Sequence, residues 1–341
     1  MEQYRDLLLL IPLLGSRMLN YSNTGREIST RPVLAILAAD IHLSHKPPLI
    51  RTAEEDWYEA MSRPLRELQS LCQTHQAPCV IAGDIFDDGW RPHKCPPSLI
   101  NLALRELPDR TYAVAGNHDL PYHRYEEVQK SAFWTLVQAG KIIPLEYKKP
   151  LELESLSLHG FPWGYDPEPI EKHDLEGRLF LAVIHVYVWS AGRGYPGAPE
   201  ESRVKNFLKK VEGFDSCVTG DNHIPISWNL KKENLGTSLF NPGVFLRRKS
   251  DEVNHQPRIG LLGYDGSVEI HYLDTSQDKL LDLSDERLKS TLLKTEEFLQ
   301  ELTSLGDSEL DFESALREEI RKDSISPKVS EIILSTLEKR K

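Results

Sequence analysis

The sequence lacks the cysteine pattern of a disulfide-rich or zinc-ribbon protein. Its four cysteines, Cys72, Cys79, Cys95 and Cys217, stand at unrelated spacings, and no two of them are separated by only two residues. A disulfide framework needs regularly spaced cysteines, and a zinc ribbon needs close pairs. The spacings argue against both classes, so we expect a reducing, cytoplasmic compartment.

The sequence also lacks a hydrophobic run long enough to cross a membrane. Its longest apolar stretch, Leu7 to Leu14, falls well short of the roughly 20 residues that a spanning helix needs. Glu2, Arg5 and Asp6 precede this stretch, so the positive start of a signal peptide is missing, and no small-residue cleavage pattern follows. We expect no membrane association and interpret residues 1–30 as an N-terminal extension.

The sequence also lacks an excess of positive charge. The 341 residues carry 41 Lys and Arg against 52 Asp and Glu, a formal net charge of −11. This balance argues against a protein that coats nucleic acid by neutralising its phosphates. It leaves room for one that holds phosphate locally through bound metal.

The first half of the chain alternates short apolar runs with helical patterns. The runs at 33–39, 79–82 and 112–115 are predicted buried strands, and each stops at a cluster of Asp, His or Asn. Helical patterns follow them, at 54–75, 97–107 and 126–139. This is an α/β arrangement, in which ligands bind beyond the carboxyl ends of the strands.

The second half is richer in strands with short connections. We predict six of them, at 156–159, 179–185, 217–219, 238–240, 259–264 and 268–273. They suggest a second sheet packed on the first, which makes a β-sandwich flanked by helices. Beyond about residue 284 the sequence is charged and helical, so we place a domain boundary near 275 and predict a C-terminal helical extension at 276–341.

Five polar clusters at predicted strand ends contain the residue types that ligate metals. They are Asp40-Ile41-His42, Gly83-Asp84-Ile85-Phe86-Asp87, Gly116-Asn117-His118-Asp119, His185 and Gly220-Asp221-Asn222-His223. Each alone is more often a turn, a cap or a core histidine. Together they supply about seven oxygen and nitrogen donors, too many for one tetrahedral zinc and suited to two metals that share a carboxylate.

The order of these motifs resembles that of the calcineurin-like metallophosphoesterase superfamily, over roughly residues 33–272. Within it the chain resembles the SbcD-type nuclease subunits of DNA double-strand-break processing complexes. Three segments carry this closer likeness, Ala39 to Leu43 (ADIHL), Gly83 to Asp87 (GDIFD, without the arginine of phosphoprotein phosphatases) and His159 to Gly164 (HGFPWG). The resemblance implies an α/β metallophosphoesterase β-sandwich of two mixed sheets, with residues 31–275 as the catalytic domain.

The resemblance also implies a role for each motif residue. One metal would be held by Asp40, His42, Asp84 and His223, and the other by Asp84, Asn117, His185 and Asp221. His118 would face the scissile phosphate, and Asp87 matches the position that orients this histidine in related phosphatases. The implied cofactors are two divalent ions, Mn²⁺ first, with Mg²⁺ or Fe²⁺ as alternatives.

One motif departs from the family pattern. The family usually has G-H-x-H, whereas this chain has Asp221 in place of the first histidine. A carboxylate still ligates and favours a harder ion such as Mn²⁺ or Mg²⁺. Asn222 is the alternative ligand, so the sequence leaves the second metal site open between these two residues.

Further residues near the motifs are candidates for substrate contacts. The basic ones are His123, Arg124, Arg247 and Arg248, and the aromatic ones are Tyr122, Trp163 and Trp189. An ordinary surface or core role is an equal interpretation for each of them. Aromatic side chains near a nuclease site would stack on bases.

The resemblance predicts a hydrolase, with three functions to separate. The leading one is a metal-dependent DNA nuclease of recombination, repair or end processing, in which two metals activate the attacking water. Its implied partners are DNA, an SbcC-type coiled-coil ATPase docked on helices of the partner-binding region at 276–341, and a second copy in a homodimer. The alternatives are a small-substrate phosphatase or phosphodiesterase of the same superfamily and a non-catalytic scaffold with the same fold.

Overall fold

The computed structural model describes residues 32–171, 177–190, 192–231 and 236–281. The predicted N-terminal extension and nearly all of the predicted C-terminal helical region lie outside these ranges, so both stay predictions. Within them, no helix has the length and apolar character needed to cross a membrane.

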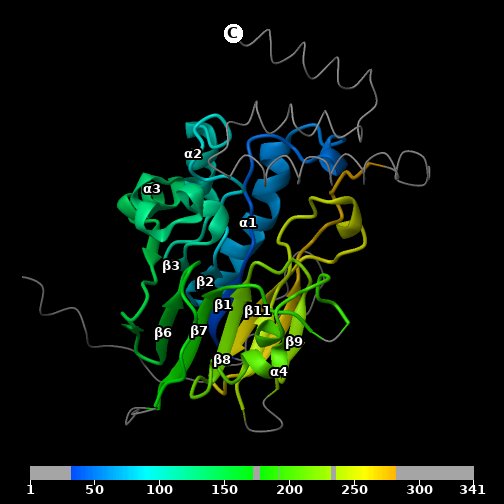
Figure 1. Ribbon diagram of the computed structural model, residues 1–341. Coiled ribbons are helices and arrows are strands. Elements are labelled where there is room, and N and C mark those ends of the chain that lie inside the picture. Colours follow the sequence, from blue (N-terminus) through cyan, green and yellow to red (C-terminus); the bar gives the residue numbers. More distant parts are fainter. Residues whose placement is uncertain (1–31, 172–176, 191, 232–235, 282–341) are drawn as a thin grey trace, which may run out of the picture. The chain divides into compact units, whose positions relative to one another are not determined.

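The described chain forms two six-stranded mixed sheets (Figure 1). The first has the order β12-β11-β1-β2-β3-β4 and the second β5-β6-β7-β8-β10-β9. In the first sheet β1 to β4 are parallel, and β11 and β12 are antiparallel to their neighbours. In the second sheet β6, β7, β8 and β10 are parallel, with antiparallel edges at β5 and β9.

The strands of the first sheet are β1 (Val33–Ala38), β2 (Cys79–Ala82), β3 (Thr111–Val114), β4 (Ile142–Pro144), β11 (Arg258–Gly263) and β12 (Val268–Tyr272). Those of the second are β5 (Leu151–Glu152), β6 (Leu156–Phe161), β7 (Leu179–His185), β8 (Ser216–Gly220), β9 (Ile226–Trp228) and β10 (Ser238–Asn241). The predicted sandwich of two mixed sheets with flanking helices is therefore confirmed.

Both faces of the central strands are buried, which explains why their sequences are continuously apolar. Along β1, Ala35 and Leu37 face the core between the sheets, where they join Leu181 and Val218 of the second sheet. The alternate residues of β1 point to the opposite face, as the two-residue period of a strand requires. That face packs against the helices of the first sheet.

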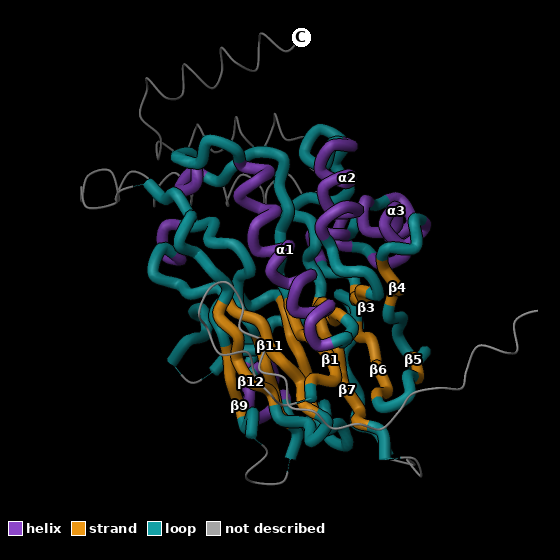
Figure 2. Tube along the Cα trace, turned by 180° about the vertical axis from the view of Figure 1, so that it is seen from behind, coloured by secondary structure: helices purple, strands orange, loops and turns teal. Residues whose placement is uncertain are grey.

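Helices cover both outer faces of the sandwich. The first sheet carries α1 (Trp57–His75), α2 (Pro97–Glu106) and α3 (Ala132–Gln138), which Figure 2 shows from the side of α1. The outer face of the second sheet packs against α4 (Val204–Phe207). Six short 3-10 helices lie in the described connections, at Leu49–Arg51, Asn117–Asp119, Pro121–His123, Tyr125–Lys130, Glu200–Ser202 and Ser250–Glu252.

Two sequence predictions need correction. The strands at 259–264 and 268–273 do not belong to the second sheet, because β11 returns to pair antiparallel with β1 in the first. The single helix predicted at 126–139 is divided at Ser131, whose backbone is extended and whose side chain accepts a hydrogen bond from Trp134 N–H. Ser131 thus begins α3 as its N-cap and ends the 3-10 helix before it.

The fold brings the polar clusters together because of strand direction. The strands β1, β2 and β3 are parallel within one sheet, and β7 and β8 are parallel within the other. Their carboxyl ends are the segments that carry the five clusters, and β2 lies against β7 across the sandwich. Ligand sites of α/β sheets lie at this edge.

The inter-sheet core sets the stability of this arrangement. Leu181→Ala removes a fully buried side chain between the sheets and is expected to lower the free energy of unfolding by about 2–5 kcal/mol. Ile143→Ala, at a position 36% exposed in the edge strand β4, is the matched control and should change it far less. Urea denaturation measures both, and equal effects would contradict the assigned core.

Candidate metal centre

The ends of five strands position the candidate ligands. Asp40 and His42 follow β1, Asp84 follows β2, and Asn117 and His118 follow β3. His185 is the last residue of β7, and Asp221 and His223 follow β8. The structure thus places all seven predicted ligands and His118 at one edge of the sandwich, with contributions from both sheets.

Several of these residues have a backbone conformation that side chains disfavour. The φ angles are 51° at Asp40, 50° at His42, 53° at Asp84 and 77° at Asp221. Left-handed conformations are uncommon outside glycine and asparagine, and strain of this kind concentrates at functional sites. The surrounding fold therefore stabilises a local geometry that these residues would not adopt alone.

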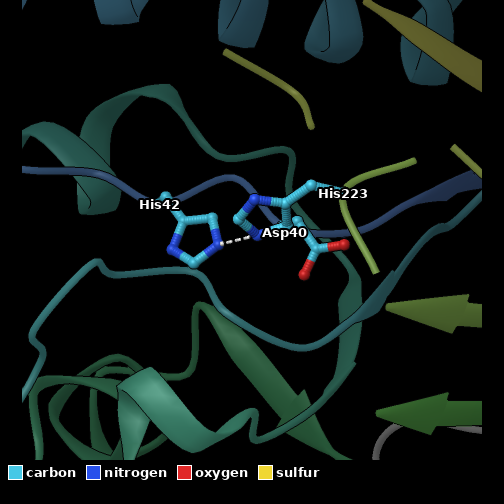
Figure 3. Close-up of side chains that lie close together, drawn as sticks. All are labelled: Asp40, His42 and His223. Carbon is cyan, nitrogen blue, oxygen red and sulfur yellow. Dashed lines mark hydrogen bonds between the residues drawn. The ribbon is translucent and has the colours of Figure 1, made fainter. Parts of the chain in front are cut away.

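A first group of donors consists of Asp40, His42 and His223 (Figure 3). One ligand atom of each lies within 4.8 Å of the others, and the Nε2 atoms of His42 and His223 are 3.0 Å apart. Asp40 Oδ1 accepts a hydrogen bond from Asp221 N–H, whereas its buried Oδ2 has no hydrogen-bond partner among the described residues. A buried carboxylate oxygen without a donor is costly, and a cation would satisfy it.

A second group gathers around His185. Its Nδ1 lies 2.8 Å from the carbonyl oxygen of Ala82, which can only accept, so Nδ1 carries the proton. In the neutral ring Nε2 is then a lone-pair donor, yet it faces Asn117 Oδ1 at 2.9 Å and Asp84 Oδ2 at 3.4 Å. Lone pairs that converge in this way are the arrangement a metal ion requires.

The carboxylate of Asp84 lies between the two groups. Its Oδ1 accepts a hydrogen bond of 3.0 Å from His118 N–H. Its Oδ2 lies 3.6 Å from Nε2 of His42 and 3.4 Å from Nε2 of His185. This position between both sets of imidazoles is the one expected of a bridging ligand.

Two glycines make room for this packing. A Cβ on Gly116 would lie 2.1 Å from Asp84 Oδ1, and one on Gly83 would lie 2.2 Å from His185 Nδ1. Gly83 also has a φ of 86°. The glycines in the G-D and G-N-H-D motifs therefore allow the backbone to approach the ligands closely.

The electrostatics of the centre are those of ionisable groups held away from water. Burial raises the pKa of Asp40 to about 7, although the His223 and His185 imidazoles oppose the shift. Burial also raises the pKa of Asp84, but the charges of His185 and His118 outweigh it and lower that pKa to about 2. Burial lowers the pKa of His185, but the charges of Asp84, Asp40 and Asp221 outweigh burial and raise it well above its usual value, so a metal ion would compete with a proton for Nε2.

His118 is held by the backbone carbonyl of Asp87, the residue that the resemblance links to its orientation. Its Nδ1 donates to the carbonyl oxygen of Asp87 at 2.6 Å. The Asp87 carboxylate instead forms an ion pair with Arg248 and lies 3.6 Å from Nδ1 of His42. Burial lowers the pKa of His118, but the charges of Asp84 and Asp87 outweigh it, so the net shift is upward.

The structure distinguishes Asp221 from Asn222. Asn222 is buried, its amide nitrogen donates to Val188 O at 2.6 Å, and its Oδ1 accepts from Ile224 N–H. Both ends of this side chain are thus engaged by the backbone. Burial raises the pKa of Asp221, and the charges of the His185 and His223 imidazoles oppose this rise, so its carboxylate lies close to the candidate ligands.

The four predicted substrate contacts differ in their surroundings. Arg247 forms a 2.7 Å ion pair with Asp278, away from the ligands, so a substrate contact is not supported for it. Arg248 lies beside the centre but pairs with Asp87. His123 Nδ1 lies 3.1 Å from Asn117 O, and Arg124 is exposed.

Sequence reasoning missed one residue of the centre, Glu252. Its Oε1 lies 3.6 Å from Nδ1 of His223, and the side chain is buried. No motif includes it, and only its position near the basic Arg247-Arg248-Lys249 run marked the segment at all. Asp119 has a structural role, since its carboxylate accepts hydrogen bonds from the N–H groups of Ile85, Phe86 and Gly116.

The ligand geometry predicts how metal binding responds to mutation. Asp84→Asn removes the charge shared by both groups and should weaken Mn²⁺ binding by more than the roughly 10–100-fold lost with an outer-shell partner. Asp109→Asn, at an 87% exposed side chain, is the matched control. Isothermal titration calorimetry with Mn²⁺ compares them, and unchanged affinity in Asp84→Asn would exclude this site.

Comparisons with known proteins identify the family but not the substrate. No curated protein matched the chain. The chain matches 109 chains of solved structures. One is the calcineurin-like phosphoesterase YfkN from Bacillus subtilis, with 14% identity, coverage of 78% of this chain and 97% of that one, and a TM-score of 0.42. Another is a dimetal phosphatase from Danio rerio, with 12% identity, coverage of 71% of this chain and 100% of that one, and a TM-score of 0.41. A third is the NAD nucleotidase of Haemophilus influenzae, which is 13% identical with a TM-score of 0.38. The match covers 76% of this chain and 55% of the nucleotidase.

The family model is the comparison that carries the assignment. The model of the calcineurin-like phosphoesterases matches residues 34–225, more than half of the chain. The matched range contains all of the clusters described above, and its donors fit the dimetal centre that the family uses. The chain therefore belongs to the calcineurin-like phosphoesterase family of phosphoester hydrolases.

Proposed function

We propose that the chain is a metal-dependent DNA nuclease of the SbcD type, which hydrolyses phosphodiester bonds. The observation that carries the proposal is the cluster of donors around Asp84, which lies within ligand distance of His42 and His118 on one side and of Asp40 and His185 on the other. The likeness of the Ala39 to Leu43 and His159 to Gly164 segments to SbcD-type nuclease subunits supports DNA as the substrate.

The candidate ligands would hold two metal ions that share Asp84. Asp40, His42, Asp84 and His223 would hold one ion, and Asp84, Asn117, His185 and Asp221 the other. When bound, two divalent ions lower the pKa of water and neutralise phosphate charge, with Mn²⁺ as our choice of ion.

His118 would act directly on the substrate. Because its Nδ1–H is engaged by Asp87 O, its Nε2 is the ring atom left for a phosphate or leaving-group oxygen. Its ring centroid lies 5.0 Å from that of His42, which places it next to the donor groups. A protonated His118 would stabilise the charge of the transition state or protonate the leaving oxygen.

An aromatic pair beside His118, formed by half-buried Trp90 and exposed Tyr122, supports a nucleic-acid substrate. The rings of Trp90 and Tyr122 have centroids 4.8 Å apart, and Tyr122 is 65% exposed. Trp90 follows Gly89, whose N–H donates to His118 O at 3.0 Å. Tyr122 has a φ of 54°, a strained backbone conformation of the kind that concentrates at functional sites. An exposed aromatic surface of this kind stacks on bases without sequence preference.

Two observations favour the second candidate, a small-substrate phosphatase or phosphodiesterase. The two arginines expected to contact DNA, Arg247 and Arg248, are both paired with carboxylates. With a net charge of −11, the chain has no overall attraction for a polyanion. A small phosphoester needs only the metal centre for its charge.

The remaining parts of the proposal concern partners. We assign residues 276–341 to docking of an SbcC-type coiled-coil ATPase, because the amphipathic patterns there cannot bury their apolar faces alone. A homodimer and a cytoplasmic location belong to the same proposal. A non-catalytic scaffold is the third function, which the following experiment addresses.

Removal of the His118 imidazole should abolish most catalysis without unfolding the protein. His118→Ala is expected to lower turnover about 10²- to 10⁴-fold, the usual contribution of a positioned acid or base. The assay uses Mn²⁺ with linear duplex DNA, circular single-stranded DNA and a simple phosphomonoester. His93→Ala, an exposed histidine, is the control.

The three functions give different results in this assay. DNA cleavage that His118→Ala loses and His93→Ala keeps supports the nuclease. Monoester turnover without DNA cleavage would establish the small-substrate enzyme. No turnover of any substrate, even with the ATPase partner present, would favour the scaffold.

The aromatic pair gives a second test of the DNA substrate. Tyr122→Ala should weaken single-stranded DNA binding by about 1–3 kcal/mol, the usual value of one stacked base. Turnover of a bis-aryl phosphodiester too small to reach this ring should stay unchanged. Fluorescence anisotropy and a colorimetric assay measure the two quantities. Tyr272→Ala, at a 47% exposed tyrosine of β12, is the control.

A further inference from the structure

A single short segment links the metal centre to a buried ion network. The segment is Arg247–Glu252, which we call the 247–252 loop, and it ends in a 3-10 helix at Ser250–Glu252. Its first residue pairs with Asp278, its second with Asp87, and its last lies against His223. This loop of six residues therefore contacts the Asp278 network, Asp87 and the candidate ligand His223.

Glu252 contacts the backbone with one oxygen and a candidate ligand with the other. Its Oε2 accepts hydrogen bonds from Arg248 N–H at 2.6 Å and Lys249 N–H at 3.0 Å. Its Oε1 lies 3.6 Å from Nδ1 of His223. The two backbone bonds fix the carboxylate within its own loop, so the position of the loop determines where Oε1 meets the imidazole.

The orientation of His223 decides which of its nitrogens faces the donor group. Nε2 lies 3.0 Å from Nε2 of His42, so it is the atom directed toward the candidate ion. A negative charge on the Nδ1 side favours the proton at that nitrogen, which leaves the Nε2 lone pair for the ion. Glu252 is the carboxylate in that place.

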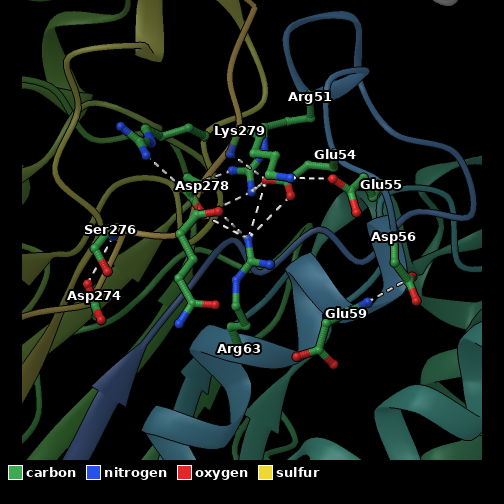
Figure 4. A network of polar contacts seen from close by, with 12 residues as sticks. Arg51, Glu54, Glu55, Asp56, Glu59, Arg63, Asp274, Ser276, Asp278 and Lys279 are labelled. Atoms are coloured by element: carbon green, nitrogen blue, oxygen red, sulfur yellow. Dashed lines mark hydrogen bonds and ion pairs between the residues drawn. The ribbon is translucent and has the colours of Figure 1, made fainter.

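The other end of the loop is anchored in a buried network of opposite charges (Figure 4). Asp278 accepts from Arg51 at 3.0 Å and from Arg247 at 2.7 Å, and it lies 3.4 Å from Arg63. Arg51 is fully buried and also pairs with Glu54 at 2.6 Å. Removing one partner of a buried ion pair leaves an uncompensated charge, so such a network resists displacement.

We propose that Glu252 is the positioning residue of His223 in the metal centre, and that the ion network at Asp278 holds the 247–252 loop in place for this role. The inference rests on the proposed metal centre and extends it to residues outside the ligand set. It connects that centre to Asp278.

Mn²⁺ affinity tests the role of Glu252 without a substrate. Glu252→Gln keeps the size of the side chain and removes its charge, and we expect calorimetry to show a loss of about 10–100-fold in affinity. Glu252→Asp, which keeps the charge on a shorter side chain, should lose less. Asp251→Asn is the matched control, because it changes the same charge at the exposed neighbouring residue.

The anchor is tested by a pair of variants in the adjoining segment. Asp278→Asn should reduce Mn²⁺ affinity, although it touches no candidate ligand, because the loop loses the partner of Arg247. Glu55→Gln is the control, because it breaks only the exposed ion pair with Lys279, the residue that follows Asp278. Circular dichroism and thermal melts establish that each variant is folded before titration.

The outcomes separate this inference from the proposed function. Unchanged affinity in folded Glu252→Gln would overturn the positioning role, and unchanged affinity in folded Asp278→Asn would overturn the anchor. If Asp278→Asn does not fold, Arg247→Gln replaces it, with the same expected loss and the same result overturning the anchor. A chain that binds Mn²⁺ with these dependences but leaves DNA intact would disprove the nuclease and retain the inference.

Discussion

The rest of the centre depends on the contacts that the Asp84 carboxylate makes with His118, His42 and His185. One oxygen is fixed by the His118 N–H, and the other faces imidazoles from both sheets. This arrangement requires a left-handed backbone at Asp84 and no side chain at Gly116. Burial of such a carboxylate is unfavourable unless opposite charge surrounds it. The imidazoles supply part of that charge, and a divalent ion would supply the rest.

The sequence was informative about the centre because its chemistry is local to strand ends. Each motif follows a short apolar strand, and parallel strands bring their carboxyl ends together whatever the detailed packing. The residue types and the sandwich could therefore be predicted. The sequence left Asp221 and Asn222 open, because the choice depends on the distant Val188 carbonyl that engages Asn222.

The predictions failed where long-range contacts decide. Nothing in the strand pattern shows that β11 returns to β1, since antiparallel pairing across most of the chain depends on the completed fold. The contact between Asp87 and His118 uses the Asp87 carbonyl, because Arg248 engages the Asp87 carboxylate, and the sequence does not reveal which of these groups makes the contact. Glu252 belongs to no motif, and only the tertiary structure brings it next to His223.

The origin of the ligands in both sheets has a consequence for the protein as a whole. Asp40 and Asp84 follow strands of one sheet, whereas His185 and His223 belong to the other. Each of the two ions would have ligands from both sheets and would act as a cross-link between the two layers of the sandwich. Since an unfolded chain offers no such set, occupancy adds to folding stability by mass action, about 2.7 kcal/mol when free metal is 100 times Kd. The supply of metal in the cell would then govern how long the folded protein persists, as well as its activity.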